Sequence, residues 1–157
     1  MKDLRVVSRK TKLDSLFALG DQLERDPNSD PELRAHFAQY LCVLVAGFVE
    51  KSVISLYSEH AKRRSSPTVF AYSTSQLSRI RNPKAGMLLE IAGTFDADWR
   101  RDLEEFLNGQ KTEALNSVMG NRHQIAHGTS VTLTYRQIYD YYGQVVGILD
   151  HIEKQVS

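Results

Sequence analysis

The chain of 157 residues lacks the features that mark secreted, membrane-spanning or disordered proteins. It has a single cysteine, Cys42, so a disulfide framework is excluded and a reducing compartment is indicated. Its four prolines and nine glycines are too few for a fold of strands and turns or for a disordered tail. The N-terminal segment has no apolar core of a secretory signal, and the longest uncharged apolar run, residues 40–49, is far too short to span a membrane. We therefore expect a cytoplasmic protein with Cys42 in a buried helix.

Excess charge of one sign is also missing. A formal net charge of +1 argues against a protein that coats nucleic acid through bulk electrostatics. There is one local exception, because no acidic residue occurs between His60 and Leu89. This stretch is either a solvated, partly loop-like surface or a patch that faces phosphate groups. Its basic residues are Lys62, Arg63, Arg64, Arg79, Arg81 and Lys84.

The residues that are present predict one helical domain over residues 1–157. A hydrophobic content of 41% and a charged content of 25% are ordinary for a soluble globular protein, and this length suits one core. Asp30 and Pro31 form a strong helix start, and apolar residues of the last segment recur at helical spacing. The one strand-like run, residues 131–134, is too short to build a sheet. We expect helices at about 10–25, 31–62, 73–80, 85–95, 98–107, 111–126 and 134–156, forming an all-α bundle with two long antiparallel helices plus shorter helices.

Most catalytic motifs are absent as well. The chain has no glycine-rich phosphate loop, no cysteine–histidine metal spacing, no carboxylate cluster placed to hold magnesium and no nucleophile elbow. What remains is the segment NRHQIAHG, residues 121–128, in which four residues separate Arg122 from His127. Twelve arginines and five histidines produce about 0.4 such pairs by chance, so the spacing alone is a weak signal.

Arg122 falls on the side of its helix that should face other helices, one heptad after Leu115 and in line with Val118 and Met119. An unpaired buried charge is very costly, so this arginine needs a partner. Three kinds of partner remain open: an acidic residue of the central helix, with Glu50 the best candidate, a second subunit, or an anionic ligand.

His127 precedes Gly128, and together they form an ordinary helix stop. Glycine accepts the left-handed conformation, and the helix dipole favours a protonated imidazole at the C-terminus. The segment is therefore either a plain helix end or an active site. Residues five apart on an ideal helix point about 140° apart, so one chain does not aim Arg122 and His127 at one point. Two protomers that meet at a two-fold axis could bring both pairs to a shared cleft.

The segment RHQIAHG, residues 122–128, resembles the signature of HEPN domains, in which an arginine is followed by a polar residue, a few variable residues and a histidine. The short β-like run after it, the tyrosine-bearing last helix and the apolar central helix that runs into VEKSVISLY are similar too. The subgroup that the chain resembles is the RiboL-PSP-type (also MAE-type) HEPN proteins of bacterial conflict systems. The likeness extends from about residue 31 onward, and His123 stands where the family commonly has asparagine.

This resemblance implies a metal-independent endoribonuclease that acts as a homodimer without a cofactor, as a toxin or phage-defence effector. RNA and a cognate antitoxin protein are the further partners it suggests, and no membrane is involved. Proton transfer would fall to His127 and the phosphate contact to Arg122. His123 and Asn121 would be auxiliary polar groups, and Glu50 would orient Arg122 or His127. The basic residues between positions 60 and 89 would form the RNA-binding patch.

Three hypotheses follow. The first is a dimeric ribonuclease, and the second is a catalytically silent HEPN-like module that binds a nucleotide, RNA or a partner protein. The third is a helical dimerisation protein in which residues 122–128 are only a helix end. Tyr139, Tyr142 and Trp99 are interpreted as packing residues under all three.

Overall fold

The computed structural model describes residues 1–157 and contains seven α-helices and no strand. This confirms the predicted all-α class. The strand-like run at residues 131–134 belongs to the connection between the last two helices. The helices are α1 (Leu4–Arg25), α2 (Pro31–Arg64), α3 (Pro67–Leu77), α4 (Ala85–Phe95), α5 (Ala97–Phe106), α6 (Gly109–Ala126) and α7 (Tyr135–Val156).

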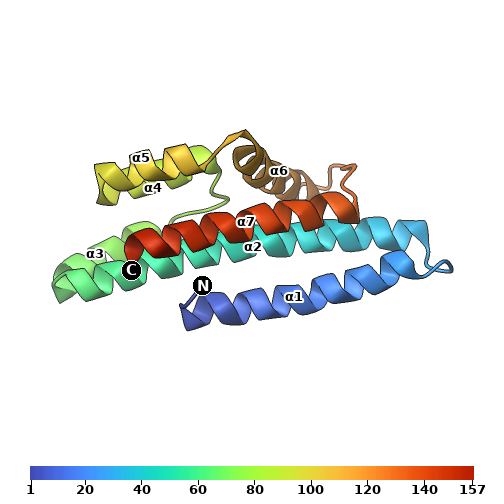
Figure 1. Ribbon diagram of the computed structural model, residues 1–157, viewed down its shortest axis with the longest axis horizontal. Helices are drawn as coiled ribbons and strands as arrows, with labels where there is room; N and C mark the ends of the chain where they lie inside the picture. The colour runs from blue at the N-terminus through green and yellow to red at the C-terminus, as the bar shows by residue number, and fades with distance from the viewer.

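Helix α2 is the axis of the molecule, and two other long helices lie along it (Figure 1). Helix α1 runs antiparallel to α2 and supplies the antiparallel pair, although the two longest helices that the sequence predicts, at 31–62 and 134–156, correspond to α2 and α7. Helix α7 runs parallel to α2, since Tyr142 packs edge-on against Phe48 and the carbonyl of Val156 lies 2.8 Å from Nδ1 of His60. The bundle thus has three long helices where the sequence predicts two. Helices α4, α5 and α6 form a second layer above α7 and α2 (Figure 1).

Capping residues fix where the long helices begin. The Asp30 carboxylate accepts a hydrogen bond from the Glu32 N–H, and Pro31 occupies the first turn of α2, as the sequence predicts. Thr134 caps α7 in a reciprocal capping box with Gln137. These local signals explain why the predicted starts of α2 and α7 agree with the structure within one residue.

Two helices differ from their predicted bounds. Helix α1 begins at Leu4 rather than near residue 10, because the Asp3 carboxylate caps its first turn. Helix α3 spans Pro67–Leu77 rather than residues 73–80, because Ser66 caps it and Pro67 stands at its first position. The same cap-then-proline pattern that marks α2 therefore also starts α3.

The core lies where α2 meets α1, α6 and α7. The apolar run at residues 40–49 supplies Leu41, Cys42 and Val45 to it, all fully buried, which confirms the predicted buried helix. Burial raises the pKa of the Cys42 thiol to about 12, so this thiol stays neutral.

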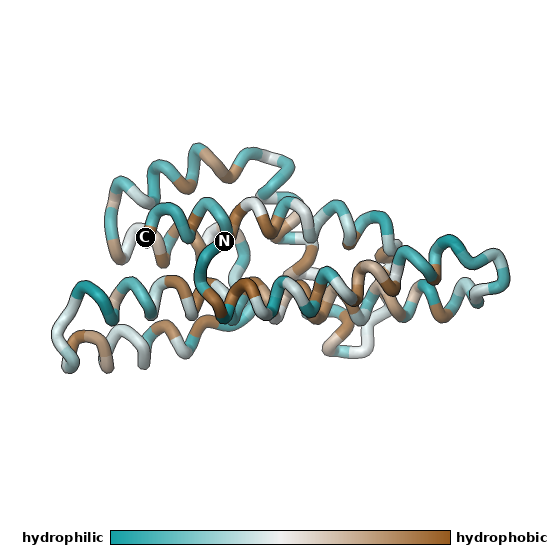
Figure 2. Tube along the Cα trace, turned by 60° about the horizontal axis from the view of Figure 1, so that its bottom comes forward, coloured by the Kyte–Doolittle hydropathy of each residue, from teal (hydrophilic) through white to brown (hydrophobic).

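In Figure 2 the hydrophilic turn between α1 and α2 contrasts with α3, an apolar helix at the other end of the molecule. Helix α2 is long and apolar enough to cross a membrane, but 61% of its most apolar window is buried inside the protein, as in a core helix.

Candidate functional site

The segment at residues 121–128 forms the last turn and the end of α6. The helix stops at Gly128, whose φ of +71° lies in the left-handed region. The N–H of Gly128 donates to the Ile125 carbonyl, and the N–H of Thr129 donates to the Gln124 carbonyl. This pair of hydrogen bonds is a Schellman motif, so the predicted helix stop is confirmed.

Arg122 lies on the packing side of α6, and its side chain is half-buried. Its backbone N–H approaches Sγ of the buried Cys42 on α2. The guanidinium belongs to no ion pair of the chain. Glu50, the acid expected to pair with it, instead accepts a hydrogen bond of 2.9 Å from the Asn82 N–H. Three apolar residues precede Arg122 on the same side of α6 and are buried, as predicted: Leu115, Val118 and Met119.

His123 and His127 lie together at the exposed end of α6. Their ring centroids are 4.5 Å apart, with the ring planes inclined by 61°. A spacing of four residues sets their side chains about 40° apart around the helix, whereas Arg122 and His127 are about 140° apart. The structure therefore brings the two histidines together and leaves Arg122 on a neighbouring side of the helix.

Asn121 donates from Nδ2 to the Ser117 carbonyl at 2.8 Å, so its amide bonds the backbone of its own helix.

The loop between α3 and α4 is attached to α6 one turn before the arginine. Asn82 donates from Nδ2 to the Met119 carbonyl at 3.2 Å, and the Ala85 N–H donates to Oδ1 of Asn116 at 3.0 Å. On the other side, the Asn82 N–H donates to Glu50 of α2. Asn82 has a φ of +50°, a conformation that asparagine tolerates better than most residues. Glu50 thus acts on this loop and not directly on Arg122.

The structure divides the predicted basic patch into two groups. Residues 79, 81 and 84 lie on or beside the α3–α4 loop and are exposed. Residues 62–64 form the last turn of α2, about 30 Å along the helix from Cys42, where α6 packs. Arg63 also donates from Nη2 to the Val156 carbonyl at 3.0 Å. Only the loop group therefore adjoins the helix that carries Arg122.

The residues that fix this loop were not predicted as part of the site. An asparagine–proline dipeptide signals a turn, so Asn82 carries a signal in the sequence. Asn116 carries none, because it is one of several polar residues on α6 and only the fold reveals that it meets the N-terminus of α4.

The aromatic residues interpreted as packing residues have that role. Trp99 packs against Tyr57 and His60, with ring centroids 6.4 and 4.9 Å away. Tyr142 is buried and donates from its hydroxyl to Asp14 of α1. Tyr139 packs edge-on against Phe17 but keeps 47% of its surface exposed.

The geometry places a half-buried arginine, two exposed histidines and a basic loop at one region of the surface. No group of three or more His, Cys, Asp or Glu side chains in the chain lies together as a metal-ligand set. A family model described as RiboL-PSP-HEPN matches residues 8–157, so the match also includes most of α1. No curated protein and no solved structure matches the chain.

Proposed function

The chain belongs to the RiboL-PSP-HEPN family, and from this premise we propose that it is a metal-independent endoribonuclease that works as a homodimer. Its biological role would be that of a toxin or phage-defence effector, held inactive by a cognate antitoxin protein. HEPN modules are commonly ribonuclease-like, and the chain carries the arginine and histidine of their signature at the end of α6. No cofactor enters this proposal.

The observation that carries the proposal is the state of Arg122. It is half-buried beside α2, yet no acid of the chain pairs with it. A guanidinium in such a place is suited to an anion from outside the chain, and its planar fork matches two oxygens of a phosphoryl group. Glu50, the acid that the sequence suggests as its partner, accepts a hydrogen bond from the Asn82 N–H instead.

The chemistry needs no added nucleophile, because RNA carries its own 2′-hydroxyl. In the proposed reaction His127 removes the proton of that hydroxyl, the 2′-oxygen bonds to phosphorus, and the bond from phosphorus to the 5′-oxygen breaks. The leaving 5′-oxygen takes a proton from a second imidazole, and His123 is the nearest one to His127. Arg122 stabilises the charge that develops on the phosphoryl oxygens. The products carry a 2′,3′-cyclic phosphate and a 5′-hydroxyl.

A second copy of the chain is part of the proposal because one copy leaves the two key side chains apart around α6. The surface that favours a second copy is an apolar line on α2 beside α6. Val43, next to the Cys42 that contacts α6, is 37% exposed, and Tyr40 and Leu33 along the same face are 50% and 52% exposed. Two such faces that meet at a two-fold axis bury this apolar surface and bring both copies of α6 together.

The test is cleavage of structured and unstructured RNA by the purified protein in excess chelator. Cleavage should persist in chelator and disappear in His127→Ala. The matched control is Gln124→Ala, an exposed neighbour on the same last turn, which should cleave normally. Cleavage that requires a metal, or that survives in His127→Ala, contradicts the proposal. Growth arrest on expression, lost with the same substitution, tests the toxin role.

One observation favours a second candidate, a catalytically silent RNA- or protein-binding module. The amide of Asn121 is already used by the backbone of α6, and His123 replaces the commoner asparagine, so the polar groups beside the pair are atypical. Under this alternative the protein binds RNA or a partner without cleaving anything, and Arg122→Ala weakens that binding while the fold is kept.

A further inference from the structure

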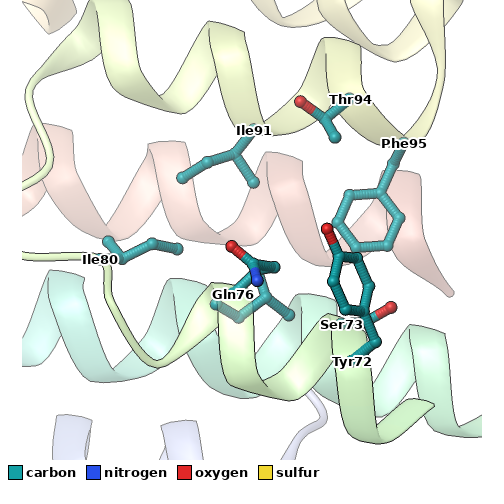
Figure 3. A pocket seen from close by; sticks show the side chains of 8 residues that line it. Tyr72, Ser73, Gln76, Ile80, Ile91, Thr94 and Phe95 are labelled. Carbon is teal, nitrogen blue, oxygen red and sulfur yellow. The ribbon is translucent and has the colours of Figure 1, made fainter. Parts of the chain in front are cut away.

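A groove separates α3 from α4. It lies away from the end of α6 that carries residues 121–128. Helix α3 packs only on α2, while α4 packs on α5 and α6, so the two helices face each other across open space. A cavity of about 230 Å³ lies between them (Figure 3). Tyr72 and Gln76 reach into it from α3, and Ile91 and Phe95 from α4.

The groove continues toward the C-terminal end of α2. A second cavity of about 320 Å³ shares Ser73, Thr94 and Phe95 with the first and adds His60 and Arg64. None of the residues that line the two cavities is acidic. Two acids that are close in sequence to the lining residues lie outside the groove. Glu90 lines neither cavity, and Asp96 caps the first turn of α5.

Two aromatic side chains line the groove from opposite sides. Tyr72 is 68% exposed and lies on α3, across the cavity from the half-buried Phe95 of α4 (Figure 3). The amide of Gln76 and the hydroxyls of Ser73 and Thr94 add polar groups between the two helices. Aromatic rings with hydrogen-bonding groups between them suit a planar heterocycle. The cavity is smaller than the roughly 300–1,000 Å³ of sites for drug-sized ligands, which fits one base better than a whole cofactor.

Charge at both ends of the groove favours a polyanion. Arg64 lines one end, whereas Arg63 on the same last turn of α2 donates to the Val156 carbonyl outside the groove. At the other end Lys84 precedes α4 by one residue and stands one heptad from Ile91, so it falls on the same face as the groove. The adjoining loop is bonded to α6 one turn before Arg122. A strand lying in the groove is thereby directed toward the candidate active site.

We propose that the α3–α4 groove binds an unpaired base of single-stranded RNA, which stacks on Tyr72 and Phe95 while Arg64 and Lys84 contact phosphates on either side. This inference deepens the proposed function, since it names how the same enzyme holds its substrate. It gives each part of the divided basic patch one phosphate contact, since Arg64 belongs to one group and Lys84 to the other. Sequence-tolerant stacking combined with backbone contacts is the usual way in which proteins hold single strands.

The test measures binding of a short single-stranded RNA with 2′-O-methyl groups, which cannot be cleaved, by fluorescence anisotropy with the full chain. Tyr72→Ala should raise Kd about tenfold, and Tyr72→Phe, which keeps the ring, should stay within about twofold of wild type. The matched control is Tyr139→Ala, because Tyr139 is an exposed tyrosine on α7 that lines a pocket with Asp14 and Asp21 of α1, outside the α3–α4 groove. Lys84→Ala should reduce the slope of log Kd against log salt by about 0.7.

The outcomes separate this inference from the proposed function. A chain that binds the oligonucleotide through Tyr72 but cleaves no RNA supports the groove and overturns the ribonuclease. A chain that cleaves RNA with Kd and KM unchanged in Tyr72→Ala overturns the groove and leaves the ribonuclease standing. Absence of oligonucleotide binding also overturns the groove. A Tyr72→Ala variant that changes only in oligomeric mass overturns it as well, and indicates a protein-docking surface instead.

Discussion

Arg122 is one of three half-buried arginines, with Arg9 and Arg34, that belong to no ion pair of the chain. Arg5, Arg101 and Arg136 each pair with an acid on or near their own helix, and their side chains are more than half exposed. Arg122 is half-buried and unpaired. No nitrogen of its guanidinium is both fully buried and without a partner, so the group is open to an anion from outside the chain. A phosphate group of bound RNA supplies the missing partner in our account.

Replacing Arg122 should therefore affect activity more than stability. Arg122→Ala should lower the rate of RNA cleavage about 10²–10³-fold, the usual effect of removing one group that stabilises transition-state charge. Arg122→Lys should recover little, because lysine lacks the planar fork. The free energy of unfolding, measured with urea, should change by less than about 1 kcal/mol. The control is Arg136→Ala on α7, which should cleave normally; an Arg122→Ala variant as active as this control contradicts the assigned role.

The end of α6 shows how an element sets the geometry of the candidate site. The Schellman motif around Gly128 fixes the direction in which the chain leaves the helix, and His127 is the last residue before that turn. A Cβ added at Gly128 meets no atom within 4 Å, so any cost of a larger residue comes from the backbone alone.

Two glycine substitutions on α6 should therefore have opposite effects. Gly128→Ala should destabilise the protein by about 1–2 kcal/mol, because φ is +71° and alanine is strained there. Gly120→Ala, in the interior of the same helix and equally free of contacts, should stabilise it by about 0.5–1 kcal/mol. Urea unfolding of both variants checks the pair. Equal effects of the two substitutions contradict the left-handed helix stop.

The bounds of the elements could be predicted where the sequence carries a local signal. Helix α4 agrees residue for residue, and α2 begins at its cap–proline pair. The start of α1 is not evident from the sequence pattern because residues 4–10, LRVVSRK, contain few apolar residues, and only the cap at Asp3 marks it. The bounds of α3 could not be predicted from periodicity, because its exposed apolar residues show no helical repeat. Its start is nevertheless signalled by Ser66 and Pro67.

At the scale of the whole molecule, the account requires a second copy of the chain. Val43→Asp places a charge in the proposed apolar contact on α2 and should convert a dimer into a monomer that retains its helix content and loses RNA cleavage. Val7→Asp is the matched control, since Val7 is 36% exposed on α1 and Val43 is 37% exposed. Light scattering coupled to size exclusion measures the mass. A Val43→Asp dimer, or an active monomer, contradicts this interface.

Stability of the whole bundle should depend on pH through Glu153, which joins the start of α1 to the end of α7. Desolvation acts to raise the pKa of this carboxyl, but hydrogen bonds from the N–H groups of Asp3 and Lys2 outweigh it and hold the pKa below its ordinary value of 4.5. A depressed pKa in the folded state stabilises the protein above about pH 4.5, and this contribution is lost as the pH falls through the folded value. Urea unfolding between about pH 6 and pH 3 should show a smaller loss for Glu153→Gln than for wild type. Parallel profiles of the two proteins would exclude this linkage.

Part of the candidate site could be read from the sequence, and part depends on tertiary contacts. The stop at Gly128 follows from helix geometry within one segment, whereas the pairing of Arg122 with His127 is what the resemblance of residues 122–128 to the HEPN signature implies. The destination of Glu50 does not, because its choice of Asn82 over Arg122 depends on how a loop 32 residues away folds back. The α3–α4 groove could not be predicted from the sequence either, since Tyr72 and Phe95 line one cavity only through the placement of two separate helices.

The most direct test of the central claim is the chemistry of the cut ends. An RNA that carries one 2′-deoxynucleotide at a mapped cleavage position is incubated with the protein in chelator, beside the unmodified RNA. The account predicts a 2′,3′-cyclic phosphate on the unmodified product and no cleavage at the deoxy position, because the 2′-hydroxyl is the nucleophile. Cleavage that persists at the deoxy position, or that leaves a 3′-hydroxyl and a 5′-phosphate, would contradict it.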